Sequence, residues 1–155
     1  MVSWYGPSRI IDRPVHSIPS HVEFYLQKLR QGDYDAAFHG LIEAEPPPIP
    51  QLIQAYRSET SSDIRRELVG IIWQYRQTSV APFLGEALSD PNPGVWKAAI
   101  NGLVALACPA GLAQLRAALT TTHSTTEETN TFHKWVEEAI EQVVQGIAQD
   151  NHRTY

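Results

Sequence analysis

The residue types that carry out chemistry in enzymes are present in this 155-residue sequence, but their spacing does not build a catalytic site. Metal sites need histidines and cysteines close together, as an i, i+4 pair on a helix or as a short cluster. The six histidines show neither pattern, and no histidine or aspartate is placed to activate the single cysteine, Cys108. We therefore expect no catalytic residue, no metal and no cofactor, and we predict that the protein is not an enzyme.

The charge balance narrows the class of partner. The chain carries 12 Lys and Arg against 17 Asp and Glu, for a formal net charge of −5. Proteins that grip nucleic acid usually have an excess of basic residues, because their phosphate contacts displace counterions. No apolar run is long enough to span a membrane, and the start lacks the pattern of a secretory signal. We expect a cytoplasmic protein that binds another protein, with neither nucleic acid nor a membrane as its partner.

Apolar residues recur every 31 positions along the chain, as Val22, Ile53, Leu84 and Leu115 show. A period between 20 and 50 residues is typical of stacked repeats, in which each unit contacts only its neighbours. Within each unit the apolar residues have three-and-four spacing, which predicts helices. The sequence therefore predicts four helix pairs.

Caps and breakers place these helices along the chain. The predicted helices span 20–31, 33–43, 50–58, 61–77, 80–88, 95–107, 112–119 and 131–148. The apolar face of the last helix is predicted to carry Phe132, Trp135, Val136, Ala139 and Val143. A polar loop is expected at 120–130, before that helix. The predicted organisation is an extended leader or cap at 1–19, a helical domain at 20–149 and a flexible tail at 150–155.

Two glycines lie at equivalent positions inside predicted helices, Gly40 and Gly102. Glycine inside a helix costs about 1 kcal/mol relative to alanine. We expect both to be explained by a close approach between helices.

Residues 80–103 read Val-Ala-Pro-Phe-Leu-Gly-Glu-Ala-Leu-Ser-Asp-Pro-Asn-Pro-Gly-Val-Trp-Lys-Ala-Ala-Ile-Asn-Gly-Leu and resemble a HEAT repeat, more closely the short variant named after phycobilisome lyases. The matching residues are Asp90, Pro91, Pro93, Val95, Ala98, Ala99 and Leu103, with Ile64, Arg65 and Leu68 one unit earlier. The resemblance implies an all-α fold, a right-handed α-solenoid of about four HEAT-like helix pairs. The family's arginine is present as Arg65 but is replaced by Trp96 in the next unit, which interrupts the Asp/Arg ladder of the family.

A stripe beside the core positions of the second helices is the candidate binding surface. Its members are Tyr34, Phe38, Ile42, Arg65, Val69, Trp73, Trp96, Ile100 and Val104. The smaller apolar members are expected to pack between units. We predict that Tyr34, Arg65, Trp73 and Trp96 are partly exposed and bind a partner, since aromatic residues and arginine are enriched at interface hot spots. The alternative is that the whole stripe belongs to the core between repeats.

These features favour a non-enzymatic protein–protein interaction module, such as an adaptor, an inhibitor or an immunity-type binder, that uses the concave face of the array. The resemblance also leaves open a bilin lyase-like accessory protein or chaperone. A nucleic-acid-acting HEAT-like enzyme is a third reading, against which the acidic balance argues. The fold alone does not separate these functions, because it hosts all three.

Overall fold

The computed structural model describes residues 21–153, which form helices joined by short connections, with no strand among them. The chain divides after Pro48 into two compact units. The predicted leader at 1–19 lies outside the described residues.

The first unit is one helix pair. Helix α2 spans His21–Arg30 and helix α3 spans Tyr34–Ile42. Gly32 makes the turn between them with a φ of 85°, a left-handed conformation that glycine adopts without strain. Asp33 caps α3 by accepting a hydrogen bond from the backbone amide of Ala36 at 3.4 Å. The first predicted pair is therefore present, close to its expected bounds.

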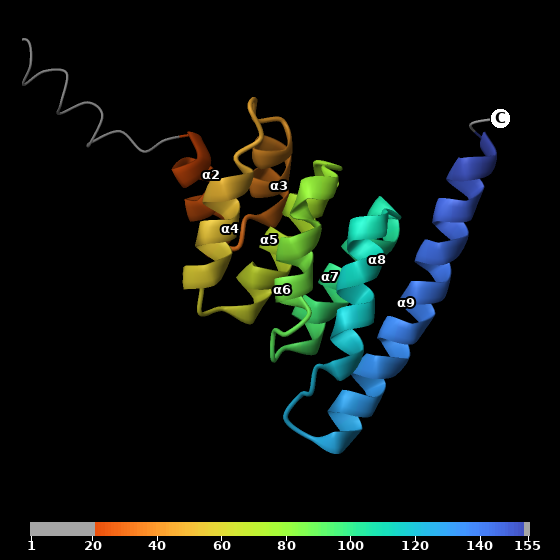
Figure 1. Ribbon diagram of the computed structural model, residues 1–155. Coiled ribbons are helices and arrows are strands. Elements are labelled where there is room, and N and C mark those ends of the chain that lie inside the picture. The colour runs from red at the N-terminus through yellow and green to blue at the C-terminus, as the bar shows by residue number, and fades with distance from the viewer. Residues whose placement is uncertain (1–20, 154–155) are drawn as a thin grey trace, which may run out of the picture. The chain divides into compact units, whose positions relative to one another are not determined.

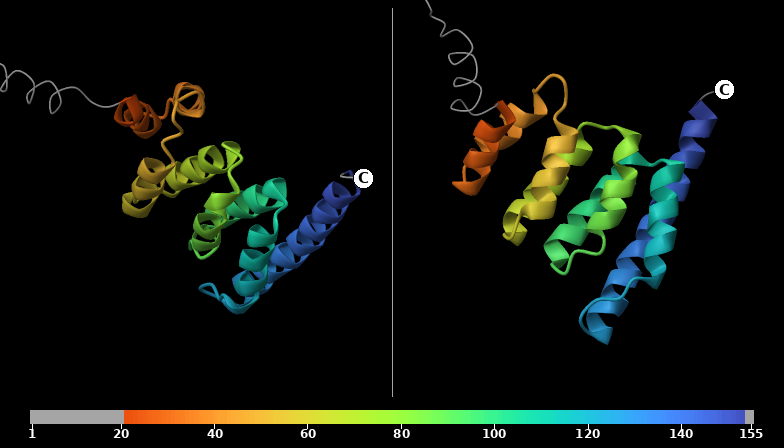
Figure 2. Two further views of the ribbon diagram at one scale, coloured as in Figure 1. Left: turned by 45° about the horizontal axis from the view of Figure 1, so that its top comes forward. Right: turned by 60° about the vertical axis from the view of Figure 1, so that its left-hand side comes forward.

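The second unit contains three helix pairs: α4 with α5, α6 with α7, and α8 with α9 (Figure 1). The helices are α4 (Ile49–Ser58), α5 (Ser62–Gln74), α6 (Ala81–Ala87), α7 (Pro93–Leu106), α8 (Pro109–Ala117) and α9 (Thr126–Arg153), with short 3-10 turns η1 (Thr78–Val80) and η2 (Ala118–Thr120). The pairs follow one another along the unit (Figure 2). The second helices form a row in which α5 packs on α7 and α7 packs on α9.

Several helices of the second unit begin at capping residues, and two of them end at residues in the left-handed conformation. Ser61, Asn92 and Cys108 each accept a hydrogen bond from a backbone amide two or three residues later. Arg76 and Ala107 lie one repeat period apart and follow the ends of α5 and α7 with positive φ angles of 60° and 45°. The same left-handed turn thus ends both second helices, which confirms that the repeat extends to the backbone.

The core of the second unit follows the predicted repeat register. Leu84 and Leu115 are fully buried, and Ile53 is half-buried. The α9 helix buries Phe132, Val136, Ala139 and Val143. Its opposite side is polar, where Glu137, Glu138 and Glu141 are exposed.

The long α9 corrects two predicted boundaries. It begins at Thr126, so the expected loop at 120–130 is shorter, and it continues to Arg153, past the helix end expected at residue 148. None of the helices among the described residues combines the length and apolar character needed to cross a membrane.

Aromatic rings explain the two glycines inside helices. In the first unit, the Tyr25 ring occupies the space into which a side chain at Gly40 would project. In the second unit, a Cβ atom at Gly102 would lie 2.8 Å from Cγ of Trp73, which is too close for real carbon atoms. Both glycines therefore permit the close approach that the sequence predicted. Trp73 comes from α5 of the preceding repeat, whereas Tyr25 comes from the first helix of the same pair.

Candidate functional site

Arg65, one of the four predicted binding residues, is held within the second unit by a carboxylate. Its Nε donates a hydrogen bond to Asp90 Oδ2 at 2.8 Å, and its Nη2 donates to Asp90 Oδ1 at 3.2 Å. Its Nη1 donates to the backbone carbonyls of Glu59 and Thr60. The Tyr56 hydroxyl also donates to Asp90 Oδ2, at 2.7 Å. The Asp90 carboxylate thus joins α4, α5 and the turn that precedes α7.

The electrostatics of Asp90 fit a structural role for this cluster. Burial alone would raise the pKa of the Asp90 carboxyl group, but hydrogen bonds from Arg65, the Asn92 amide and Tyr56 outweigh burial and lower it. Burial, with the bond to Asp90, raises the pKa of the Tyr56 hydroxyl, which keeps its proton and its donor role. The Arg65 side chain is only 15% exposed. Arg65 therefore stabilises the contact between repeats, and its role in binding stays a prediction.

Trp96 is 3% exposed, so the prediction that it is partly exposed is wrong. Its indole lies among other rings, with centroids 5.0 Å from Phe132 and 6.0 Å from both His123 and Trp135. Phe132 and Trp135 belong to α9, and His123 lies in the connection before it. The physical reason for the burial is therefore the packing of α9 and the connection before it against α7, which covers the indole.

This ring cluster takes the place that an ion pair holds one repeat earlier. Trp96 is the counterpart of Arg65 in the next repeat, and Thr121 is the counterpart of Asp90, so neither charge is present at the next interface. Edge-to-face aromatic pairs contribute about 0.5–1.5 kcal/mol beyond the area that they bury. The α7–α9 interface is therefore held by rings where the preceding interface is held by charge.

The other two predicted binding residues, Trp73 and Tyr34, are partly exposed, as expected. The Arg76 guanidinium lies over the Trp73 ring, with Cζ 5.6 Å from the ring centroid, and its Nη1 donates to the carbonyl of Ala105 in α7 at 3.1 Å. Tyr34 is the first residue of α3 in the first unit. Whether Tyr34 and Trp73 contribute to one surface stays a prediction.

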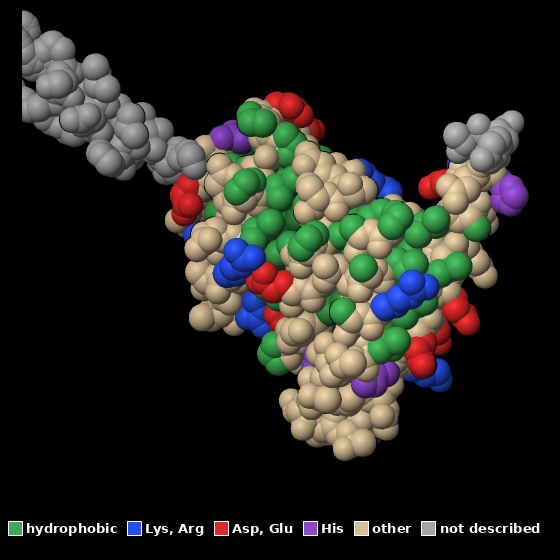
Figure 3. All heavy atoms as spheres, in the orientation of Figure 1, with side chains coloured by type: hydrophobic (Ala, Val, Ile, Leu, Met, Phe, Trp, Pro, Cys, Tyr) green, Lys and Arg blue, Asp and Glu red, His purple; other side chains and the backbone are tan. Residues whose placement is uncertain are grey.

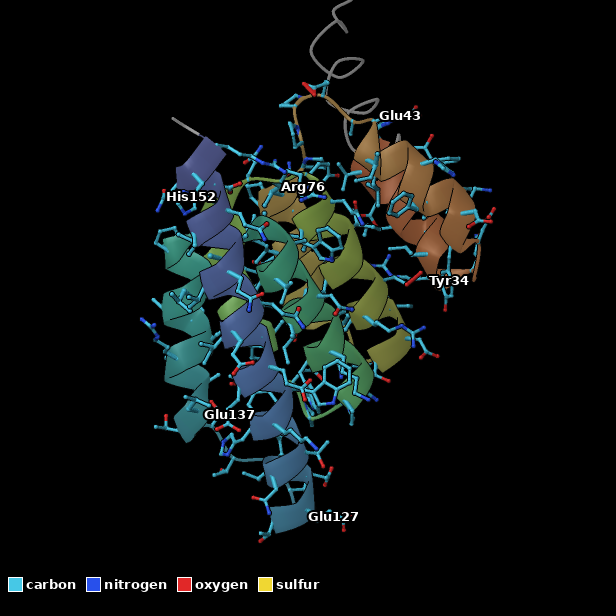
Figure 4. The ribbon with its side chains drawn as sticks, turned by 90° about the vertical axis from the view of Figure 1, so that its right-hand side faces the viewer. Tyr34, Glu43, Arg76, Glu127, Glu137 and His152 are labelled. Carbon is cyan, nitrogen blue, oxygen red and sulfur yellow. The ribbon has the colours of Figure 1, made fainter. Side chains whose placement is uncertain are left out.

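Equivalent residues line the solvent side of α5 and α7. With Trp135 of α9 they form what we call the second-helix face: Arg66, Gly70 and Trp73 on α5, and Lys97, Asn101 and Val104 on α7. Each α7 member follows its α5 counterpart by one repeat period, and every member of the face is half-buried or exposed. Val69 and Ile100 are buried, which confirms that they belong to the core. Figure 4 looks along the row from the α9 side, with Arg76 and Glu127 near opposite ends of the second unit.

Trp135 is the exposed tryptophan that the sequence reasoning missed. The sequence places it on the apolar face of the last helix, but it is 36% exposed. The helical spacing held a signal: Trp135 follows Phe132 by three residues, about 60° short of a full turn, which places it at the flank of the buried stripe. The Lys97 ammonium lies 4.9 Å from the Trp135 ring centroid and 5.7 Å from that of Trp96. Lys97, a cation over two indoles, was also missed.

A pocket of about 410 Å³ opens beside these residues, between α7 and the first turns of α9. Its lining is Pro93, Trp96, Lys97, Thr125, Glu127, Glu128 and Thr131. Thr125 caps α9 by accepting a hydrogen bond from the Glu128 amide at 3.0 Å, and the Thr125 hydroxyl donates to the Glu128 carboxylate at 3.3 Å. The second-helix face therefore combines aromatic and basic groups on α5 and α7 with an acidic border on α9.

Residues 49–129 match the sequence pattern of HEAT repeats. The match covers more than half of the chain, from α4 into the first turn of α9. The chain belongs to the HEAT-repeat family. Proteins of this family generally mediate protein–protein interactions and are typically non-enzymatic scaffolds. The all-α HEAT-repeat architecture inferred from the sequence is therefore confirmed, while the phycobilisome-lyase variant stays a prediction.

No curated protein and no solved structure matches the chain.

The Asp90 cluster generates a prediction about pH. Because the folded-state pKa of Asp90 is lowered, its contribution is present above the unfolded-state value of about 4 and is lost as pH falls through the folded-state value. Asp90→Asn should cost about 1–3 kcal/mol of unfolding free energy at pH 7, since it weakens buried hydrogen bonds. In urea unfolding, the difference between wild type and variant should shrink at pH 3. An equal difference at both pH values would contradict this assignment.

A second prediction concerns Trp96 and Trp135, whose burial is the opposite of what the sequence predicted. Trp96→Ala removes a buried ring and should cost about 3–5 kcal/mol of unfolding free energy. Trp135→Ala acts at a partly exposed site and should cost less than about 1 kcal/mol. Urea unfolding followed by circular dichroism measures both losses. Equal losses in the two variants, or a larger loss for Trp135→Ala, would show that the burial of these residues is misassigned.

Proposed function

We propose that this HEAT-repeat protein is a non-catalytic protein-binding module whose partner occupies the second-helix face. The observation that carries the proposal is the placement of two partly exposed indoles, Trp73 and Trp135, on the row of second helices. Partly exposed aromatic residues in a setting of mixed polarity are typical of interface hot spots. An adaptor, an inhibitor and an immunity-type binder would all use such a surface. A cytoplasmic location is part of the proposal.

Neighbouring residues support binding at this face. Gly102 and Arg76 hold the Trp73 ring between them, and Lys97 lies over Trp135, so both indoles are positioned before a partner arrives. Side chains that are already ordered lose less conformational entropy on binding, which favours affinity. The two ordered indoles are therefore better anchors for a partner than mobile surface side chains would be.

The face formed by α4, α6 and α8 has a different character. In Figure 3 this side of the second unit shows apolar side chains interspersed with polar atoms and a few charged groups. One ion pair on this face joins two of its helices: Arg57 Nη2 on α4 and Glu86 Oε1 on α6 lie 2.7 Å apart. This face supplies no aromatic anchor comparable to Trp73 or Trp135 among the large exposed apolar residues of the second unit, which are Leu119, Trp135 and Val144.

The proposal is tested by affinity capture with the full chain. Wild type, a Trp73→Ala/Trp135→Ala double variant and a Leu119→Ala/Val144→Ala control are immobilised and exposed to a lysate of the native host. Captured proteins are quantified by mass spectrometry. Truncation of a hot-spot aromatic costs at least about 2 kcal/mol of binding, or roughly 30-fold in affinity. We expect specific partners to be lost by the double variant and kept by the control.

The control variant makes this result specific. Leu119 and Val144 are exposed apolar residues outside the second-helix face, and Val144 lies half a turn around α9 from Trp135, because nine residues rotate a helix by about 900°. Circular dichroism confirms that each variant is folded before capture. Equal capture by wild type and the Trp73→Ala/Trp135→Ala variant would reject the second-helix face as the binding surface.

A further inference from the structure

Gly70 is a glycine that packing within the chain does not explain. It lies in the interior of α5, where glycine destabilises a helix relative to alanine. Elsewhere in the second unit, a Cβ atom at Gly102 would collide with Trp73, and one at Gly85 would collide with the Gln114 side chain. At Gly70, by contrast, no atom beyond its chain neighbours and the local backbone of its own helix lies within 4 Å of the position of a Cβ. The absent side chain leaves an open place on the second-helix face between Arg66 and Trp73.

The same face carries basic groups at equivalent positions of two repeats. Arg66 and Lys97 lie one repeat period apart on the solvent side of α5 and α7. Arg66 Nη1 lies 3.8 Å from the exposed Asp63 carboxylate, a distance at which the pair is weak in water. Lys97 lies over indole rings, and no carboxylate of the described residues forms an ion pair with it. Lys97 shares the lining of the pocket with Glu127 and Glu128, and among the described residues Arg66 has only the weak pair with Asp63. A partner that brings carboxylates would therefore meet two cations without a close ion pair.

Three rows cross the two helices at this place. Arg66 and Lys97 form a basic row, Gly70 and Asn101 a small polar row, and Trp73 and Val104 an apolar row. The first and last rows are about 10 Å apart along α5, because seven residues rise about 1.5 Å each. This spacing is close to the width of one peptide segment with its side chains. The Asn101 amide, which is exposed, can donate to and accept from such a segment where it passes over Gly70.

We propose, building on the proposed function of the second-helix face, that the partner contributes an acidic peptide segment which crosses α5 and α7 over Gly70. Its carboxylates face Arg66 and Lys97, and its apolar side chains contact Trp73 and Val104. Glu127 and Glu128 on α9 confine the acidic residues of the partner to the α5–α7 part of the face by repulsion. Charge complementarity of this kind selects the partner and speeds its association.

The experiment uses a displayed library of random dodecapeptides, selected on the immobilised full chain at physiological salt and counted by sequencing. Selected peptides should be enriched in Asp and Glu beside apolar residues and depleted in Lys and Arg. Enrichment should fall at least tenfold on an Arg66→Glu/Lys97→Glu variant. It should persist on an Arg116→Glu/Lys134→Glu control, which makes the same change in net charge at exposed positions outside the face.

Gly70→Gln tests where the segment passes. The open space around Gly70 should accommodate the glutamine with no loss of thermal stability, while enrichment of acidic peptides falls at least tenfold. Gly70→Ala, whose methyl group meets no neighbour, serves as a second variant if the glutamine perturbs folding, and should weaken peptide binding in the same direction. Undiminished binding by the folded variants would overturn the proposed path over Gly70.

Other outcomes separate this inference from the proposed function. Selection of basic or neutral peptides, acidic peptides that bind the charge-reversed variant as well as wild type, or no enrichment would overturn the acidic-segment proposal. If capture still depends on Trp73 and Trp135 in that case, the proposed function stands and only the nature of the partner segment is wrong. If capture does not depend on those residues, both proposals fall.

Discussion

The buried carboxylate of Asp90 is the interaction on which the second unit depends. It accepts hydrogen bonds from Arg65 on α5, Tyr56 on α4 and the Asn92 amide at the start of α7, so one side chain fixes three elements of two successive repeats. A buried charge is costly without partners, and breaking such a cluster costs more than a surface ion pair contributes. The same α5–α7 interface also brings the Trp73 ring against Gly102.

The next interface, between α7 and α9, is packed without an ion pair. With tryptophan at position 96 and threonine at position 121, α9 contributes Phe132 and Trp135 to a ring cluster instead. Because Trp96 fills the interior, Trp135 lies at the rim, where Lys97 rests on its ring. The ring cluster, the partly exposed Trp135 indole and the adjoining pocket therefore all lie at the interface where tryptophan and threonine replace the Arg–Asp pair.

Much of this architecture is predictable because it depends on local spacing. Apolar periodicity and caps locate the helices, and the buried Leu84 and Leu115 follow from the repeat register. The burial of Trp96 is not predictable in this way, because it depends on the tertiary packing of His123, Phe132 and Trp135 against α7, which local spacing does not show. The resemblance to HEAT repeats implies an Asp/Arg ladder, but the stripe pattern of the sequence predicts a binding role for Arg65, and the direct pairing of Arg65 with Asp90 is seen only in the folded chain.

The central claim is that partners bind the row of second helices and leave the row of first helices uncovered. Hydrogen–deuterium exchange of the full chain, with and without a partner obtained by capture, tests this most directly. Bound partner should slow amide exchange in α5, α7 and the first half of α9, with exchange in α4, α6 and α8 unchanged. Slowed exchange confined to α4, α6 and α8 would contradict the account.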